Sequence, residues 1–205
     1  MSTAVPGLPR PVVLIGPLAA GKSTVGTELA RLLDVPICSI DDVRWTYFDQ
    51  IGYDATEADR CFAAGRTPAE KMAYGKPFEV YAIEQVMAGG RHGVVDFGAS
   101  NSVYDDPALL ARVAAALSGS HVVLLLPSED AATSARVLEA RLRAILRAKG
   151  EQVGPDLLAL NAYFVGHEAN RQLANDIVYT ADRPPSAIAA EVARALDAAM
   201  RRSGA

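Results

Sequence analysis

The chain has 205 residues, of which half are hydrophobic and about a fifth are charged, and its formal net charge is −4. This length and composition fit one globular domain over 1–205 and leave little room for a second one. The negative charge gives no reason to expect a nucleic acid as partner, and no apolar run approaches the roughly 20 residues that a membrane helix needs.

The N-terminal stretch 1–11 lacks a charged segment followed by an apolar one, so we expect a short disordered lead-in rather than a signal peptide. The two cysteines, Cys38 and Cys61, form no CxxC pair and stand in no His/Cys cluster. Such cysteines are typical of reduced thiols. We therefore predict a cytoplasmic protein without a membrane or nucleic-acid partner, and no pattern indicates an oligomeric state.

Short apolar runs alternate with longer amphipathic patterns along the chain. The expected strands are 12–15, 35–40, 92–98, 121–127 and 175–180, and the expected helices are 22–33, 68–88, 106–117, 129–149, 155–173 and 185–201, with a mixed segment at 41–65. Pro77 is expected to break or kink the helix at 68–88. Strands that are apolar on both faces and separated by helices predict a parallel sheet inside a three-layer α/β/α sandwich.

The stretch GPLAAGKST lies between the first expected strand and the first expected helix. It matches G-x-x-x-x-G-K-[ST] at every fixed position, the pattern of a loop whose backbone N–H groups cradle phosphates. Lys22 is placed to reach the β- and γ-phosphates and Ser23 to ligate Mg²⁺, while the helix N-terminus adds partial positive charge. The predicted nucleotide-binding residues of this loop are Gly16, Pro17, Leu18, Ala19, Ala20, Gly21, Lys22, Ser23 and Thr24.

Several classes of protein use such a loop. GTPases carry an N-K-x-D guanine reader, which we do not find, and motor ATPases end a strand in Asp-Glu, whereas no Glu follows Asp96. Another NTPase and a non-catalytic nucleotide-sensing module stay as alternatives. The intact Lys22 and Ser23 favour a kinase over the sensing module.

The loop, the five-strand pattern and the length resemble the shikimate kinase-like branch of the P-loop kinases. The resemblance implies the sheet order 2-3-1-4-5 and the transfer of the ATP γ-phosphate, with Mg²⁺, to a hydroxyl of a small metabolite. It also implies a helical lid at about 130–160 and an acceptor-binding segment at about 41–90. In that family the segment that corresponds to 182–185 packs on the adenine, which selects Arg183 and Pro184.

The stretch SIDDVR places Asp41 and Asp42 at the carboxyl end of the second strand, where ligands of open parallel sheets bind. The resemblance implies an aspartate that orients the acceptor hydroxyl and takes its proton. We choose Asp41, with Asp42 as the alternate; the competing interpretation is that the pair caps the next helix. Ser39 replaces the first Asp of the family's D-x-D pattern. Arg44 is placed to contact a substrate phosphate or to pair with an acid.

Asp96 ends the third strand and is a candidate magnesium ligand or acceptor contact, or a cap of its own turn. Gly98 is expected to allow close approach of the backbone to the substrate. The resemblance further implies lid arginines that close over the transferring phosphate. Of the four on helix 129–149 we choose Arg136 and Arg143; the competing interpretation is a solvated face paired with Glu139 and its neighbours.

The sequence departs from shikimate kinases at both arginines that hold the shikimate carboxylate in that family. Glu79 stands where the first arginine is expected, and counting back for the second reaches His167, with Arg171 one turn away. We therefore predict that the acceptor is not shikimate. An acidic Glu79 in the acceptor pocket suits a hydroxyl- or amine-bearing acceptor, such as a sugar, an aminosugar or an amino alcohol.

A nucleoside or nucleotide acceptor is the alternative. Aromatic residues that could stack on a base are frequent in 43–65, but basic groups are few there.

Overall fold

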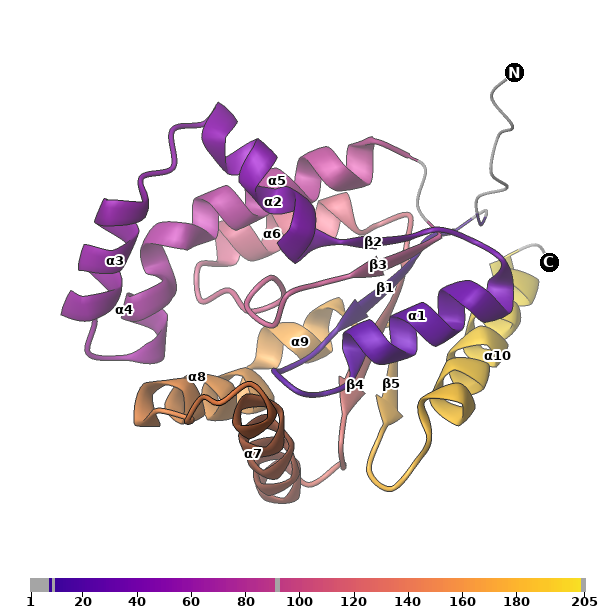
Figure 1. Ribbon diagram of the computed structural model, residues 1–205. Coiled ribbons are helices and arrows are strands. Elements are labelled where there is room, and N and C mark those ends of the chain that lie inside the picture. The colour runs from indigo at the N-terminus through magenta and orange to yellow at the C-terminus, as the bar shows by residue number, and fades with distance from the viewer. Residues whose placement is uncertain (1–7, 9, 91–92, 204–205) are drawn as a thin grey trace.

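The computed structural model describes residues 8, 10–90 and 93–203, so most of the predicted lead-in at 1–11 lies outside the described residues. Its centre is one parallel sheet with the order β2-β3-β1-β4-β5 (Figure 1). The strands are β1 (Val12–Ile15), β2 (Ile37–Ser39), β3 (Val94–Asp96), β4 (His121–Leu126) and β5 (Asp176–Tyr179). The predicted strand order is confirmed.

Helices follow the strands, and the sequence supplies a cap for many of them. Pro107 begins one helix behind the Asp106 side chain, which accepts the N–H of Ala108, and Asp130 caps the next in the same way through Thr133. The helices are α1 (Lys22–Leu33), α2 (Ile40–Gln50), α3 (Ala55–Ala64), α4 (Pro68–Met72), the 3₁₀ turn η1 (Ala73–Gly75), α5 (Lys76–Ala88), α6 (Pro107–Ala116), α7 (Ala131–Ala148), α8 (Pro155–Gly166), α9 (Glu168–Leu173) and α10 (Pro185–Ser203).

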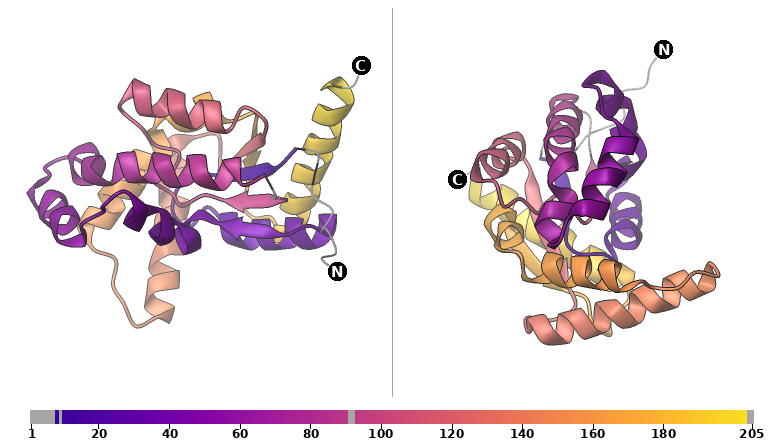
Figure 2. Two further views of the ribbon diagram at one scale, coloured as in Figure 1. Left: turned by 90° about the horizontal axis from the view of Figure 1, so that it is seen from above. Right: turned by 90° about the vertical axis from the view of Figure 1, so that its left-hand side faces the viewer.

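The sheet separates two hydrophobic cores. Successive side chains of β1 alternate between them, with Val12 and Leu14 facing α1 and α10, and Val13 and Ile15 facing α2, α5 and α6. All four side chains are fully buried, as expected of a central parallel strand. The predicted three-layer α/β/α sandwich is thereby confirmed, and the layers are separated in the left view of Figure 2.

Two predicted helices are divided. The helix expected over 68–88 is interrupted by η1, and Pro77 lies in the first turn of α5, where its missing N–H leaves no hydrogen bond unmade. The helix expected over 155–173 ends at Gly166, and His167 caps α9 by accepting the N–H of Ala169. The mixed segment at 41–65 contains α2 and α3.

The strands end in register, and this brings the loops after them together. Leu14 of β1 and Ser39 of β2 both lie opposite Asp96 of β3. α7 and α8 lie together at this end of the sheet, on the side toward which α3 and α4 also project (Figure 1). Within the ranges that the structure describes, no helix is both long and apolar enough to cross a bilayer.

Candidate active site

The loop at 16–24 curls at the end of β1 through three residues with positive φ. Gly16 has φ 141°, Ala19 61° and Gly21 99°. A Cβ on Gly16 would lie 2.5 Å from the carbonyl oxygen of Leu125 on the neighbouring strand β4. Only glycine fits this position, because both the backbone conformation and the space exclude a side chain.

Lys22 begins α1, and its ammonium lies over the curl of the loop. The Nζ donates to the carbonyl oxygens of Gly16 at 2.8 Å and Pro17 at 2.9 Å, and the residue is only 8% exposed. Burial lowers the pKa of Lys22 to about 8, although the carboxylates of Asp96 and Asp41 act in the opposite direction. The side chain is therefore mostly protonated at neutral pH and carries positive charge beside the loop.

Asp96 lies beside Lys22 and Ser23 at the end of β3, where it is 7% exposed. Burial raises the pKa of this carboxyl above its ordinary value, while the Ser23 hydroxyl and the Lys22 ammonium lower it. Its Oδ1 has no hydrogen-bond partner among the described residues. A buried carboxylate oxygen without a partner, next to a hydroxyl, fits the oxygen ligands that magnesium takes.

A cavity of about 540 Å³ opens on one side of the loop. Of the two residues selected in the segment after β5, Arg183 lines this cavity and Pro184 does not; the proline that lines it is Pro185. Arg183 donates to the Tyr179 carbonyl oxygen at 2.8 Å and pairs with Glu191, which fixes its side chain against the cavity.

The lining of this cavity also includes an arginine that the sequence analysis did not choose. Arg141 of α7 donates to the Thr180 hydroxyl at 3.2 Å and to the Thr180 carbonyl oxygen at 3.1 Å. It stands three residues after the buried Leu138, and residues at this spacing are neighbours on one side of a helix. That spacing is the sequence signal that distinguishes Arg141 from the outer arginines.

A second cavity, of about 570 Å³, opens on the other side of the loop, at the carboxyl ends of β2 and β3. Asp41, Asp42, Asp96 and Gly98 line it, so four of the six predicted acceptor-side residues come together there. The two cavities share three lining residues, which are Ala19, Lys22 and Ser23.

Gly98 lies against the Asp41 carboxylate. A Cβ at this position would stand 2.5 Å from Asp41 Oδ1 and 2.5 Å from the Asn101 side-chain oxygen. Asn101 is fully buried, and neither its oxygen nor its nitrogen has a partner among the described residues. The absence of a side chain at Gly98 therefore determines where Asp41 stands, and Asn101 is a neighbour that sequence patterns did not indicate.

Arg44, predicted to contact substrate or an acid, pairs with an acid. Its Nη1 lies 3.0 Å from Asp41 Oδ1, and its guanidinium lies 4.8 Å from the centre of the Trp45 ring. Asp41 and Asp42 lie in the first turn of α2, and the structure shows no side-chain capping bond at the Ser39 N-cap. The negative charge of the pair is nevertheless favourable at a helix N-terminus.

Glu79 does not line the second cavity. It is 8% exposed, its Oε2 accepts Lys76 Nζ at 2.9 Å, and its Oε1 accepts the Ser100 hydroxyl at 2.6 Å. Lys76 also donates to the Ser100 carbonyl oxygen at 2.6 Å. The Lys76–Glu79 pair therefore supports the loop that contains Gly98 from outside the second cavity. An acceptor ligand was expected inside it.

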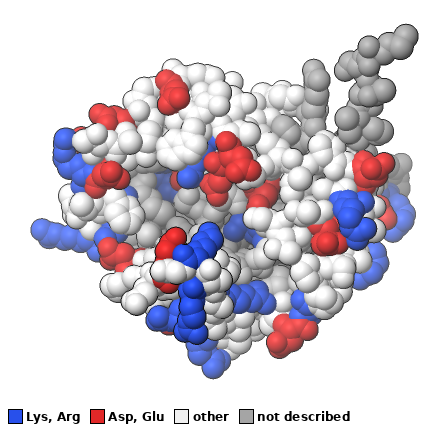
Figure 3. Space-filling model, in the orientation of Figure 1, with Lys and Arg blue, Asp and Glu red and all other residues white. Residues whose placement is uncertain are grey.

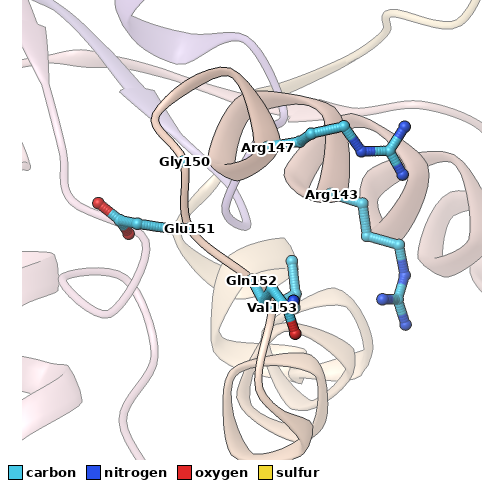
Figure 4. A pocket seen from close by; sticks show the side chains of 6 residues that line it. All are labelled: Arg143, Arg147, Gly150, Glu151, Gln152 and Val153. Atoms are coloured by element: carbon cyan, nitrogen blue, oxygen red, sulfur yellow. The ribbon is translucent and has the colours of Figure 1, made fainter.

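The two chosen lid arginines lie on the exposed side of α7. Arg136 donates to the Thr133 hydroxyl at 3.0 Å, and Arg143 pairs with Glu139 at 2.7 Å. Arg143 and Arg147 line a cavity of about 420 Å³ with the loop 150–153, and both extend from the same side of α7 (Figure 4). Figure 3 shows Lys and Arg side chains gathered over the region of α7.

The two candidates for the second carboxylate-binding arginine, His167 and Arg171, also lie outside the second cavity. His167 caps α9 and its Nε2 lies 3.3 Å from Asp105, while Arg171 is exposed. Of the residues that line the second cavity, Lys22 is the one with a cationic side chain.

Comparisons with solved structures agree with the fold. A shikimate kinase from Acinetobacter baumannii in complex with shikimate is 19% identical, with a TM-score of 0.58 over 92% of this chain and 93% of that one. The chain has a shikimate kinase-like P-loop kinase fold. A gluconokinase from Sinorhizobium meliloti 1021 is 15% identical, with a TM-score of 0.59 over 97% and 99% of the two chains.

An unliganded sugar kinase from Janibacter sp. HTCC2649 is 12% identical, with a TM-score of 0.54 over 94% and 95% of the two chains. These structural neighbours are small-molecule kinases, and their likeness to this chain is one of fold. No family model matches the chain, and no curated protein matches it.

Proposed function

We propose that this P-loop-fold protein is an ATP-dependent kinase that transfers the γ-phosphate to a hydroxyl of a small metabolite other than shikimate. The observation that carries the proposal is the meeting of two cavities at Lys22 and Ser23. One cavity has the loop and arginines that suit a nucleotide; the other has aspartates that suit an acceptor. A phosphoryl group held at the shared residues faces both partners of the transfer.

The side chains present divide the chemistry between them. The oxygen of the acceptor hydroxyl bonds to the γ-phosphorus while the bond between that phosphorus and the ADP oxygen breaks, and Asp41 takes the proton of the hydroxyl. Lys22 neutralises negative charge that develops on the phosphoryl oxygens. Ser23 and Asp96 are the residues that would hold Mg²⁺, and when bound the ion supplies further charge neutralisation.

The charges on the acceptor side support an acceptor without a carboxylate. Three aspartates line that cavity, and the nearby cations Arg44 and Lys76 are each paired with an acid, Asp41 and Glu79 respectively. Among the described residues that line this cavity, a carboxylate would meet three aspartates and no guanidinium, and the one cation, Lys22, lies beside the phosphate loop. A neutral or amine-bearing polyol, such as a sugar, an aminosugar or an amino alcohol, avoids this repulsion.

The test is ADP release with Mg²⁺ across a panel of sugars, aminosugars, amino alcohols, nucleosides, nucleoside monophosphates and shikimate. We expect one acceptor to stimulate turnover, Lys22→Ala to abolish it, and Asp41→Asn to lower kcat by about a thousandfold while ATP still binds. Asp49→Asn is the matched control, because Asp49 is an exposed aspartate of the same helix α2 and does not line the cavity. Asp49→Asn is expected to retain most of the activity.

Stimulation by a nucleoside or a nucleoside monophosphate would instead establish the alternative acceptor class. ATP binding that Lys22→Ala removes, with no turnover in any mixture and no change of binding or conformation in Asp41→Asn, would favour a nucleotide-sensing module over a kinase. Strong stimulation by shikimate would contradict the proposed acceptor class.

A further inference from the structure

Helix α8 contacts the phosphate loop through one buried asparagine. Asn161 Oδ1 accepts the Leu18 N–H at 2.8 Å, and Asn161 Nδ2 donates to the Leu18 carbonyl oxygen at 3.3 Å. Because an N–H can only donate and a carbonyl oxygen can only accept, the two contacts fix which way the amide faces. Asn161 is 4% exposed, so water does not readily replace these bonds.

The same turn of α8 carries a small apolar cluster. Leu160 and Phe164 are buried with Ala99 and Val103 of the loop after β3, and Leu18 packs against the group. α8 therefore contacts the phosphate loop at Leu18 and the loop after β3 at Ala99, and both of these residues line the second cavity.

The first turn of α8 is held by a different kind of contact. It follows the loop 149–154 and begins at Pro155. Its first turn is tied to α4 by an ion pair of 2.8 Å between Lys71 and Asp156, whose side chain is 64% exposed. The Lys71 side chain is 15% exposed. The helix is thus bonded to α4 at its first turn and to the phosphate loop at its middle.

We infer that Asn161 is a positioning residue that holds the Leu18 peptide, and with it the curl of the phosphate loop. The role rests on the proposed function, because the loop must bind ATP for its curl to matter to turnover. Asn161 itself lines neither of the two cavities that meet at the loop, so it acts through Leu18.

A second buried asparagine provides a matched control. Asn170 of α9 is 2% exposed and also makes two side-chain bonds, accepting the Ser102 hydroxyl at 2.6 Å and donating to the Phe164 carbonyl oxygen at 2.8 Å. Neither bond involves the phosphate loop. Asn161→Ala and Asn170→Ala should therefore destabilise the fold similarly and differ only in their effect on the loop.

The experiment compares Asn161→Ala, Asn161→Asp and Asn170→Ala in two measurements on the full chain. The hydrogen-exchange rate of the Leu18 amide is measured without nucleotide. We expect it to be at least about tenfold faster than in the wild type in Asn161→Ala, and within about twofold of the wild type in Asn170→Ala. Calorimetry is expected to show an MgATP Kd about tenfold higher in Asn161→Ala and unchanged in Asn170→Ala. Asn161→Asp keeps the oxygen that accepts the Leu18 N–H and loses the N–H that donates to the Leu18 carbonyl. Its Leu18 exchange rate and its MgATP Kd should therefore lie between those of the two alanine variants.

Equal Leu18 exchange or equal MgATP affinity in the two alanine variants would overturn the inference. If Asn161→Ala does not fold, Asn161→Asp is compared with Asn170→Ala instead. The expected increase in the Leu18 exchange rate and in the MgATP Kd is then about threefold. A wild-type protein that binds no ATP would reject the proposed function instead, and the Leu18 exchange rates, which need no nucleotide, would still decide whether Asn161 holds the loop.

Discussion

The two cavities that meet at Lys22 are built in different ways. The nucleotide side is made mainly of backbone that the loop itself presents, with Arg141 and Arg183 each fixed by bonds to nearby carbonyl oxygens. The acceptor side is made of charged side chains whose places depend on contacts between distant segments, such as Asp41 against Gly98. The loop of the nucleotide side is therefore a property of local sequence, whereas the acceptor side depends on packing.

The largest effect should come from giving the loop a side chain at Gly16. In Gly16→Ala the Cβ would stand 2.5 Å from the Leu125 carbonyl oxygen at a φ of 141°. We expect loss of detectable ATP binding and a free energy of unfolding lower by about 2–4 kcal/mol. Calorimetry and denaturant melts measure the two effects.

Gly119→Ala is the control for this change, since a Cβ there meets no atom within 4 Å. Its stability should stay within about 0.5 kcal/mol of the wild type. A Gly16→Ala protein that binds ATP normally would show that the nucleotide side tolerates a distortion of its backbone.

The corresponding change on the acceptor side should leave nucleotide binding intact. In Gly98→Ala the new methyl group displaces the Asp41 carboxylate, which lies 2.5 Å from its position. We expect kcat to fall about a hundredfold because the proton acceptor is misplaced, while the MgATP Kd changes less than twofold. Parallel losses of ATP affinity and kcat would show that the two sides are not built independently.

The sequence predicted the parallel sheet from local patterns, the apolar runs of strand length, and it predicted the order of the strands through the resemblance that the glycine-rich motif carries. It did not predict the place of Glu79, because the pairing with Lys76 and Ser100 depends on how α5 meets the loop after β3. Arg141 was passed over because the choice among the arginines followed the exposed face of the helix. Asn101 and Asn161 belong to no motif and gain their neighbours only on folding.

Arg141 and Arg143 provide a smaller test of the nucleotide side. Arg141 lines the nucleotide cavity and bonds to Thr180, whereas Arg143 lies outside it and pairs with Glu139. We expect Arg141→Ala to raise the MgATP Kd about tenfold through the lost guanidinium. Arg143→Ala should leave that Kd unchanged.

A drop in kcat for Arg143→Ala at unchanged Kd would support the predicted closing of this lid arginine over the phosphate. Equal Kd values for both variants would remove Arg141 from the nucleotide site.

The smallest effect concerns pH and connects the two sides. Lys22 must be protonated to attract phosphate, and burial lowers its pKa to about 8. Association of MgATP should therefore weaken above about pH 8, by about tenfold for each further pH unit, and should be near half its maximum at pH 8. The Asp41 carboxylate raises the pKa of Lys22, so Asp41→Asn, which removes that charge from the acceptor side, should shift the midpoint of the binding profile to lower pH. Asp41 does not line the nucleotide cavity, so we expect such a shift to act through Lys22, which both cavities share. An unchanged midpoint would mean that the charge of Asp41 does not affect the pKa of Lys22.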